Sequence, residues 1–181
     1  MLIGISGKFN SGKDTLTNGI LEFYEKQNIE TLHLKFADKL KQVCSIISGT
    51  DLEDGYTEKG KEKFIESLNL TLGRFQQLLG TNLRSIHPDI WVIPVIDQYL
   101  KNCNKVCVVS DVRFKNEADS IKQNGGILIR INRNIKVNNG RDPLHISETD
   151  LDDYSGFDLV IDNNGTIEEL IRKAIDFLES L

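Results

Sequence analysis

The chain has 181 residues, of which 39% are hydrophobic and 27% are charged, and its formal net charge is −5. These values predict one folded domain and exclude a disordered, collagen-like or low-complexity chain. The net negative charge disfavours non-specific binding to nucleic-acid polymers. No apolar run approaches the roughly 20 residues of a membrane span. With no signal peptide, the three cysteines (Cys44, Cys103 and Cys107) predict reduced thiols and a cytoplasmic location.

The order of apolar segments predicts a three-layer α/β fold. Five short apolar runs predict strands at residues 2–6, 31–35, 106–110, 127–131 and 158–161. Apolar residues at helical spacing predict helices around residues 16–23, 40–47, 72–79 and 167–178. Strands without polar alternation are buried on both faces, and intervening helices imply parallel crossovers. We therefore expect a central five-stranded parallel sheet covered by helices.

Residues typical of helix ends support the predicted boundaries of the helices. Gly125 with Gly126 is typical of a helix end before the fourth strand. Thr166 with Glu169, and Ser147 with Asp150, match the spacing of a capping box at a helix start. Two polar stretches, residues 49–62 and 132–153, are either binding loops or lids, or plain surface excursions.

The strongest motif is the segment from Gly7 to Lys13, which reads Gly-Lys-Phe-Asn-Ser-Gly-Lys between the first strand and the first helix. It satisfies the Gly-x-x-x-x-Gly-Lys pattern of a nucleotide-binding P-loop. Backbone N–H groups of such a loop, including those of Asn10 and Ser11, converge on a polyphosphate at a helix N-terminus. Gly7 and Gly12 permit close approach, and Lys13 can reach the β- and γ-phosphates. The loop does not match the Gly-x-Gly-x-x-Gly pattern of dinucleotide-binding (Rossmann) proteins.

Acidic residues near the loop are candidate magnesium ligands. Asp14, followed by Thr15, stands where a P-loop usually has Ser or Thr. A carboxylate beside a triphosphate needs an intervening cation, so Asp14 binds magnesium directly or through water, or it only favours the helix N-terminus. Asp111 ends a buried strand, where an acid holds magnesium in P-loop proteins or simply caps the next turn.

Arginines are the candidate phosphate clamps. Five lie in or beside polar connections: Arg74, Arg84, Arg113, Arg133 and Arg141. Guanidinium groups bind phosphate in a bidentate manner and neutralise charge during phosphoryl transfer, although each arginine could instead form a surface ion pair. A phosphomonoester acceptor, with a second pKa of about 6, needs clamps more than a general base. Among the histidines, only His145 is kept as a functional candidate.

Several segments together resemble one family. Residues 7–15, which end in Ser-Gly-Lys-Asp-Thr, resemble the phosphate loop of viral and phage deoxynucleoside monophosphate kinases. Other segments resemble that family in order: residues 36–41 (with Lys39 where proline is usual), 74–81 with Arg84 and Trp91, 111–117 running on to Gly126, 145–148 and 162–166. The resemblance spans nearly the whole chain.

The resemblance implies transfer of the ATP γ-phosphate to a deoxynucleoside monophosphate (dNMP), with Mg²⁺, in a P-loop NTPase fold. It implies a helical substrate-binding insertion over about residues 36–100 and a short lid near residues 132–146, the rest (1–35 and 101–181) being the core. Lys13 would hold donor phosphates, while Asp14, Thr15 and Asp111 manage magnesium. Asn164 and Gly165 would border the adenine.

For the acceptor side, the resemblance implies phosphate contacts from Arg74 and Arg113, with Arg133 and Arg141 closing from the lid. The remaining expected substrate contacts are Asp38, Lys41, Gln77, Thr81, Arg84, Trp91 and Glu117. Trp91 lies near the acceptor base or, alternatively, packs in a helical core. If the chain is viral, its location is the host cytoplasm.

Other readings stay open on sequence alone. P-loop kinases for phosphomevalonate share the Ser-Gly-Lys-Asp loop, and dephospho-CoA kinases share the C-terminal Asn-Gly-Thr/Ser loop. A non-catalytic nucleotide switch is a third alternative, although no Asn-Lys-x-Asp guanine-reading motif occurs. The sequence does not determine the accepted base, the preference for deoxyribose, or whether the chain is a monomer or a homodimer.

Overall fold

A computed structural model of the protein describes residues 1–133 and 146–181. The described chain divides into two compact units, Met1–Lys35 with Ile96–Leu181, and Phe36–Val95. The first unit contains the P-loop and the second is mainly helical. Within the described residues, none of the helices combines the length and the apolar character that crossing a membrane requires.

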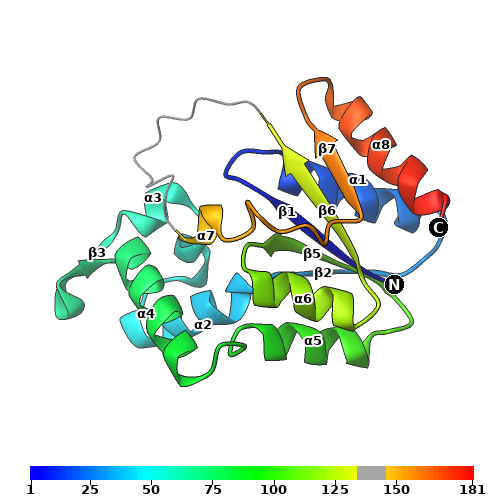
Figure 1. The fold of residues 1–181 in the computed structure, drawn as a ribbon. Coiled ribbons are helices and arrows are strands. Elements are labelled where there is room, and N and C mark those ends of the chain that lie inside the picture. The colour runs from blue at the N-terminus through cyan, green and yellow to red at the C-terminus, as the bar shows by residue number, and fades with distance from the viewer. Residues whose placement is uncertain (134–145) are drawn as a thin grey trace. The chain divides into compact units, whose positions relative to one another are not determined.

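The first unit is built on a five-stranded sheet (Figure 1). Its strands are β1 (Leu2–Gly7), β2 (Thr31–Leu34), β5 (Val106–Val112), β6 (Ile127–Asn132) and β7 (Leu159–Asp162). The spatial order is β2-β5-β1-β6-β7, and every neighbouring pair is parallel. The predicted parallel sheet is therefore confirmed, with β1 at its centre. Because carboxyl ends of parallel strands share one edge, the residues that follow β1, β5, β6 and β7 gather there.

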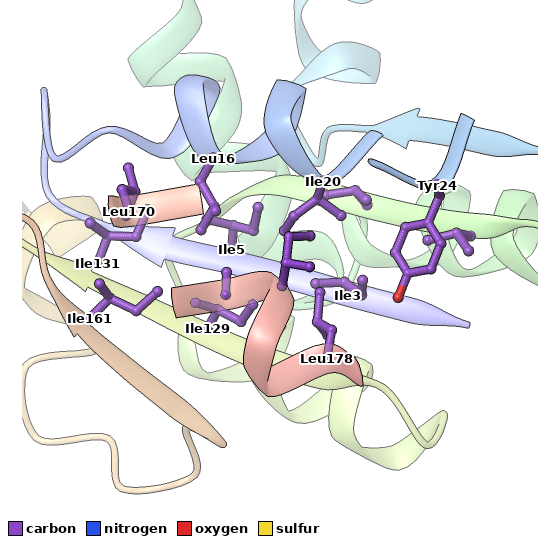
Figure 2. Packing of buried hydrophobic residues seen from close by; sticks show 14 residues of the cluster. Ile3, Ile5, Leu16, Ile20, Tyr24, Ile129, Ile131, Ile161, Leu170 and Leu178 are labelled. Carbon is purple, nitrogen blue, oxygen red and sulfur yellow. The ribbon is translucent and has the colours of Figure 1, made fainter. Parts of the chain in front are cut away.

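Helices cover both faces of this sheet, as predicted for a three-layer α/β fold. They are α1 (Lys13–Lys26), α6 (Lys115–Gln123) and α8 (Ile167–Glu179), and the short α7 (Ile146–Thr149) belongs to the same unit. In Figure 1, α1 and α8 lie side by side on one face and α6 lies on the other. Figure 2 shows how Ile3 and Ile5 of β1 pack against Leu16 and Ile20 of α1, with Leu170 of α8 beside them. All five side chains are almost completely buried, so this apolar layer fixes the start of α1 against the end of β1.

The helix ends confirm two of the three sequence signals. Thr166 and Glu169 form a capping box, with the Glu169 N–H donating to Thr166 Oγ1 over 3.2 Å. Gly125 follows α6 with φ +71°, a left-handed conformation that glycine adopts without a side-chain clash. The capping box at Ser147 is wrong, because α7 begins at Ile146 and Ser147 lies inside it. Asp150 instead accepts a hydrogen bond from the Lys115 N–H at the start of α6, over 2.7 Å.

The second unit has a small core of its own. Its main helices are α2 (Ala37–Ser48), α3 (Glu58–Lys61) and α4 (Leu72–Ile86), with a hairpin of β3 (Phe64–Ile65) and β4 (Leu70–Thr71). Two 3₁₀ turns cover Leu52–Gly55 and Glu66–Leu68, and α5 (Val92–Lys101) runs across the boundary between the units. Cys44, Ile65 and Leu72 form the buried centre.

Candidate active site

The P-loop has the shape that the sequence predicts. It connects β1 to α1, and the first helical hydrogen bond, from the Leu16 N–H to the Gly12 carbonyl, is 2.9 Å long. A Cβ at Gly7 would lie 2.7 Å from the Ile131 carbonyl oxygen, and one at Gly12, where φ is +106°, would lie 2.6 Å from Asn163 Nδ2. Both positions therefore require glycine. The first-turn N–H groups of α1 have no partner within the helix and are available to an anion.

Lys13 is the charged centre of this loop. Its Nζ donates to the carbonyl oxygens of Gly7 and Lys8, each over 2.8 Å. Burial, followed by the positive charge of Arg113, lowers the pKa of Lys13 to about 8. The ammonium is thus held over the loop at a cost in solvation, which an anionic ligand would offset.

Two carboxylates lie near the same ammonium. The charges of Asp14 and Asp111 both act to raise the pKa of Lys13. Asp14 is exposed in the first turn of α1, followed by the partly buried Thr15, whereas Asp111 is half-buried within β5. The structure therefore brings all three predicted magnesium residues to one end of the sheet, from two separate elements.

Two of the predicted arginines also reach this end. Arg113 follows β5, forms an ion pair with Glu148 and donates from Nη1 to the Ser147 carbonyl over 3.3 Å. Arg133 follows β6 and donates to the Asn10 carbonyl of the P-loop over 3.4 Å. Arg141, His145 and most of the expected lid fall on residues 134–145, outside the described residues.

Two polar residues at the loop have no role in the sequence analysis. Asn163 is buried and donates from Nδ2 to the Ser11 carbonyl over 2.8 Å, which supports the loop from β7. Glu148 of α7 accepts a hydrogen bond from the Phe9 N–H over 3.0 Å. Asn164 and Gly165, the expected adenine contacts, are exposed just beyond Asn163. The sequence carried one signal for each of these two residues. The Asn-rich turn at residues 163–165 marked Asn163, and the acidic run that begins at residue 148 marked Glu148.

Glu117 is another buried support. Its side chain is 2% exposed, and its carboxylate accepts hydrogen bonds from the Arg113 N–H over 2.8 Å and the Phe114 N–H over 3.1 Å. These bonds fix the turn that carries the Arg113 guanidinium. The contact of Glu117 with substrate stays a prediction, while its support of this turn is a structural fact.

The other expected acceptor residues belong to the helical unit. Asp38 of α2 accepts a hydrogen bond from the Tyr56 hydroxyl over 2.7 Å, and the Lys41 ammonium lies 3.7 Å from the centre of the Tyr56 ring. On α4, Arg74 donates to Gln77 over 3.4 Å. Thr81 and Arg84 continue the same helix.

Trp91 is part of the interior of that unit. Its side chain is 5% exposed, and its indole N–H donates to the Gly80 carbonyl over 3.1 Å. A satisfied, buried indole fits the packing alternative, so Trp91 is omitted from the acceptor contacts proposed below.

The described side chains suit a polyphosphate ligand. Backbone amides at a helix start, the Lys13 ammonium and the Arg113 guanidinium supply positive charge and hydrogen-bond donors. Ser11 Oγ is buried and has no hydrogen-bond partner in the described structure, so it is a further donor at the loop. Carboxylates beside these cations suit a divalent cation bound with the phosphates.

Comparisons with known proteins point to one enzyme class. The family model for deoxynucleotide monophosphate kinases matches residues 56–174. A protein of Acanthamoeba polyphaga mimivirus, named provisionally as a deoxynucleotide monophosphate kinase, is 32% identical over 198 residues, covering 99% of this chain and 97% of that protein.

Solved structures share the fold at low sequence identity. APE1195 matches with a TM-score of 0.53 and 15% identity, covering 100% of this chain and 96% of that one. The APS kinase CysC of Mycobacterium tuberculosis matches with a TM-score of 0.50 and 14% identity, covering 98% and 96%. These likenesses concern the fold alone.

Proposed function

The chain belongs to the deoxynucleotide monophosphate kinase family and is a kinase with a P-loop fold, and from that premise we propose that it transfers the ATP γ-phosphate to a deoxynucleoside monophosphate. The products would be ADP and the deoxynucleoside diphosphate. The observation that carries this proposal is the convergence of Lys13, Arg113 and Asp111 at the P-loop. We also propose the cytoplasm as its place of action, which suits three unpaired cysteines, all in the described part of the chain.

The proposed reaction needs positioning and charge stabilisation more than acid–base chemistry. A phosphate oxygen of the acceptor attacks the γ-phosphorus, and the bond from that phosphorus to the β–γ bridging oxygen breaks. The acceptor oxygen is already ionised at neutral pH, so no side chain has to remove a proton. Lys13 and the loop amides would hold the donor phosphates, while Arg113 and Arg133 would bind charge that develops on the transferred group.

The helical unit would supply the acceptor contacts. Arg74 is the proposed clamp for the acceptor phosphate, together with Arg113 of the core. The hydrogen bond from Arg74 to Gln77 holds the Arg74 guanidinium on an exposed face of α4. Polar side chains of the same unit would contact the deoxynucleoside of the acceptor. They are Asp38, Lys41, Gln77, Thr81 and Arg84. Asn164 and Gly165 remain the proposed neighbours of the adenine of ATP.

Magnesium fits the donors at the loop. Among residues 1–133 and 146–181, no group of three or more His, Cys, Asp or Glu side chains could hold a metal ion by itself. Mg²⁺ commonly takes one or two carboxylates and completes its shell with phosphate and water oxygens, so Asp14, Thr15 and Asp111 suit it. When bound, the ion would neutralise charge on the β- and γ-phosphates.

Replacing Asp111 by Asn should weaken magnesium binding and so raise the magnesium requirement. The amide keeps the shape but loses the charge, so we expect the Mg²⁺ concentration for half-maximal turnover to rise about five- to tenfold. A magnesium titration at saturating ATP measures this shift. Asp176→Asn is the matched control, because Asp176 pairs with Arg172 on the surface of α8. An unchanged titration for Asp111→Asn would leave Asp111 a structural residue.

The rate should depend on the protonation of Lys13. Its pKa is lowered to about 8, so the ammonium of the free enzyme is lost as the pH rises through that value. We expect kcat/KM for ATP to fall about tenfold between about pH 7 and pH 9, where the phosphates are already ionised. A Lys13→Arg variant cannot lose its charge in this range, so its residual activity should show no such decline. The same decline in both proteins would assign it to another group.

A coupled assay of ADP release tests the proposed function. The chain is mixed with ATP, Mg²⁺ and each of the four common dNMPs in turn, with ATP alone as the background. We expect at least one dNMP to accelerate ADP release by orders of magnitude. If ATP binds but no dNMP accelerates release, the proposed reaction is wrong and a nucleotide-binding switch becomes the better account.

A further inference from the structure

Glu148 places a carboxylate within the phosphate site. Its side chain is 11% exposed; one carboxylate oxygen accepts from the Phe9 N–H over 3.0 Å, and the other pairs with Arg113. Burial acts to raise the pKa of Glu148, but the charge and hydrogen bond of Arg113 and the Phe9 N–H hold it below its usual value. The group is therefore an anion at neutral pH.

The donors around Glu148 are those that a phosphate would use. They are a backbone N–H of the P-loop, a guanidinium and the nearby Lys13 ammonium, whose pKa the Glu148 charge acts to raise. The proposed reaction needs no general base. A fixed carboxylate in this place would repel a triphosphate and neutralise Arg113, which the reaction needs as a cation.

The segment that follows Glu148 has separate attachments to the same unit. Asp150 accepts from the Lys115 N–H over 2.7 Å. Asp152 pairs with Lys8 over 2.8 Å and with the buried Arg130 over 3.1 Å. Because these contacts do not involve Glu148, its carboxylate can leave the loop while the segment stays in place.

We propose that Glu148 occupies the place of a phosphate oxygen and that a nucleotide phosphate displaces it, taking over the Phe9 N–H and the Arg113 guanidinium. This inference rests on the proposed function, since it concerns the same phosphate site. Glu148 is then an affinity-determining residue: it keeps Arg113 next to the loop in the free enzyme and competes with the incoming anion. Removing its charge should tighten phosphate binding.

Calorimetric titration of the Glu148→Gln variant tests the proposal. Glutamine keeps the size and hydrogen-bonding capacity of the side chain and removes its charge. The titrants are ATP with Mg²⁺, a dNMP, and inorganic tripolyphosphate. We expect about three- to tenfold tighter binding than the native chain for at least one of them, and more at low salt. A gain with ATP and tripolyphosphate assigns the place to the donor, and a gain with the dNMP alone assigns it to the acceptor.

Asp153→Asn is the matched control. It makes the same change of charge in the same segment, but Asp153 is exposed and pairs with Lys115. We expect its dissociation constants to stay within about twofold of the native values. Equal or weaker binding by Glu148→Gln for all three titrants would overturn the proposal, as would an equal gain in the control.

A second measurement needs no variant. In a crystal structure of the native chain with a non-hydrolysable ATP analogue and the dNMP, we expect the Phe9 N–H to donate to a phosphate oxygen and Glu148 to have left it. Retention of both Glu148 contacts with both ligands bound would contradict the exchange. If the native chain binds ATP but phosphorylates no dNMP, the proposed function fails, while the comparison of variants still decides the role of Glu148.

Discussion

Replacing Lys13 by Ala is expected to lower kcat about a thousandfold or more, equivalent to about 4 kcal/mol of transition-state stabilisation. The variant loses the ammonium that the P-loop holds at the donor phosphates. The fold should melt at nearly the native temperature, because the charged lysine is itself disfavoured by burial, as its pKa of about 8 indicates. Steady-state turnover and a thermal melt measure the two effects.

The control for that variant is Lys26→Ala. Lys26 lies at the other end of α1 and pairs with Glu22 on the surface, so its loss should change turnover less than about twofold. Full turnover in Lys13→Ala would remove the argument from the P-loop. A large drop in the melting temperature would instead mean that the lysine serves mainly to hold the loop carbonyls.

Replacing Arg113 by Ala is expected to lower kcat/KM for the dNMP by about a hundred- to a thousandfold. The Arg113 guanidinium lies beside the loop, on a turn that Glu117 fixes. A lysine ammonium cannot form the bidentate hydrogen bonds that a guanidinium forms with a phosphate. Arg113→Lys should therefore recover less than about a tenth of the lost activity. Steady-state rates with the dNMP and ATP varied in turn separate loss of acceptor binding from loss of donor binding.

Arg172→Ala serves as the matched variant for Arg113. Arg172 pairs with Asp176 on the exposed face of α8, four residues along the same helix. Removing it should leave both specificity constants within about twofold of native. If Arg113→Ala turns over the dNMP as fast as this variant does, Arg113 has no part in the reaction.

The sheet could be predicted because its signal is local. Apolar runs without polar alternation identify all five strands, and the spacing of the glycines and Lys13 identifies the P-loop. The boundaries differ slightly: β5 continues to Val112, so Asp111 lies one residue before the end of the strand and not at its last position. Strand order places β5 beside β1, so Asp111 still lies at the edge of the sheet that carries the P-loop.

The supporting residues could not be predicted because their contacts are remote in sequence. Asn163 bonds to Ser11 across 152 positions, and Glu148 bonds to Phe9 across 139. Asn163 lies just beyond β7 and Glu148 lies in the four-residue α7, and neither segment is long enough to show a periodicity in the sequence. The sequence leaves two alternatives for Trp91, a place near the acceptor base or packing in a helical core, and its buried indole, which donates to the Gly80 carbonyl, fits the second.

The most direct test of phosphoryl transfer follows the γ-phosphate itself. The native chain is incubated with γ-labelled ATP, Mg²⁺ and the preferred dNMP, and the products are separated by chromatography. The label should move into the deoxynucleoside diphosphate in a one-to-one ratio with the ADP formed, and Lys13→Ala should abolish the transfer. Label that stays in ATP, or that appears only as inorganic phosphate, would contradict a kinase that acts on deoxynucleoside monophosphates.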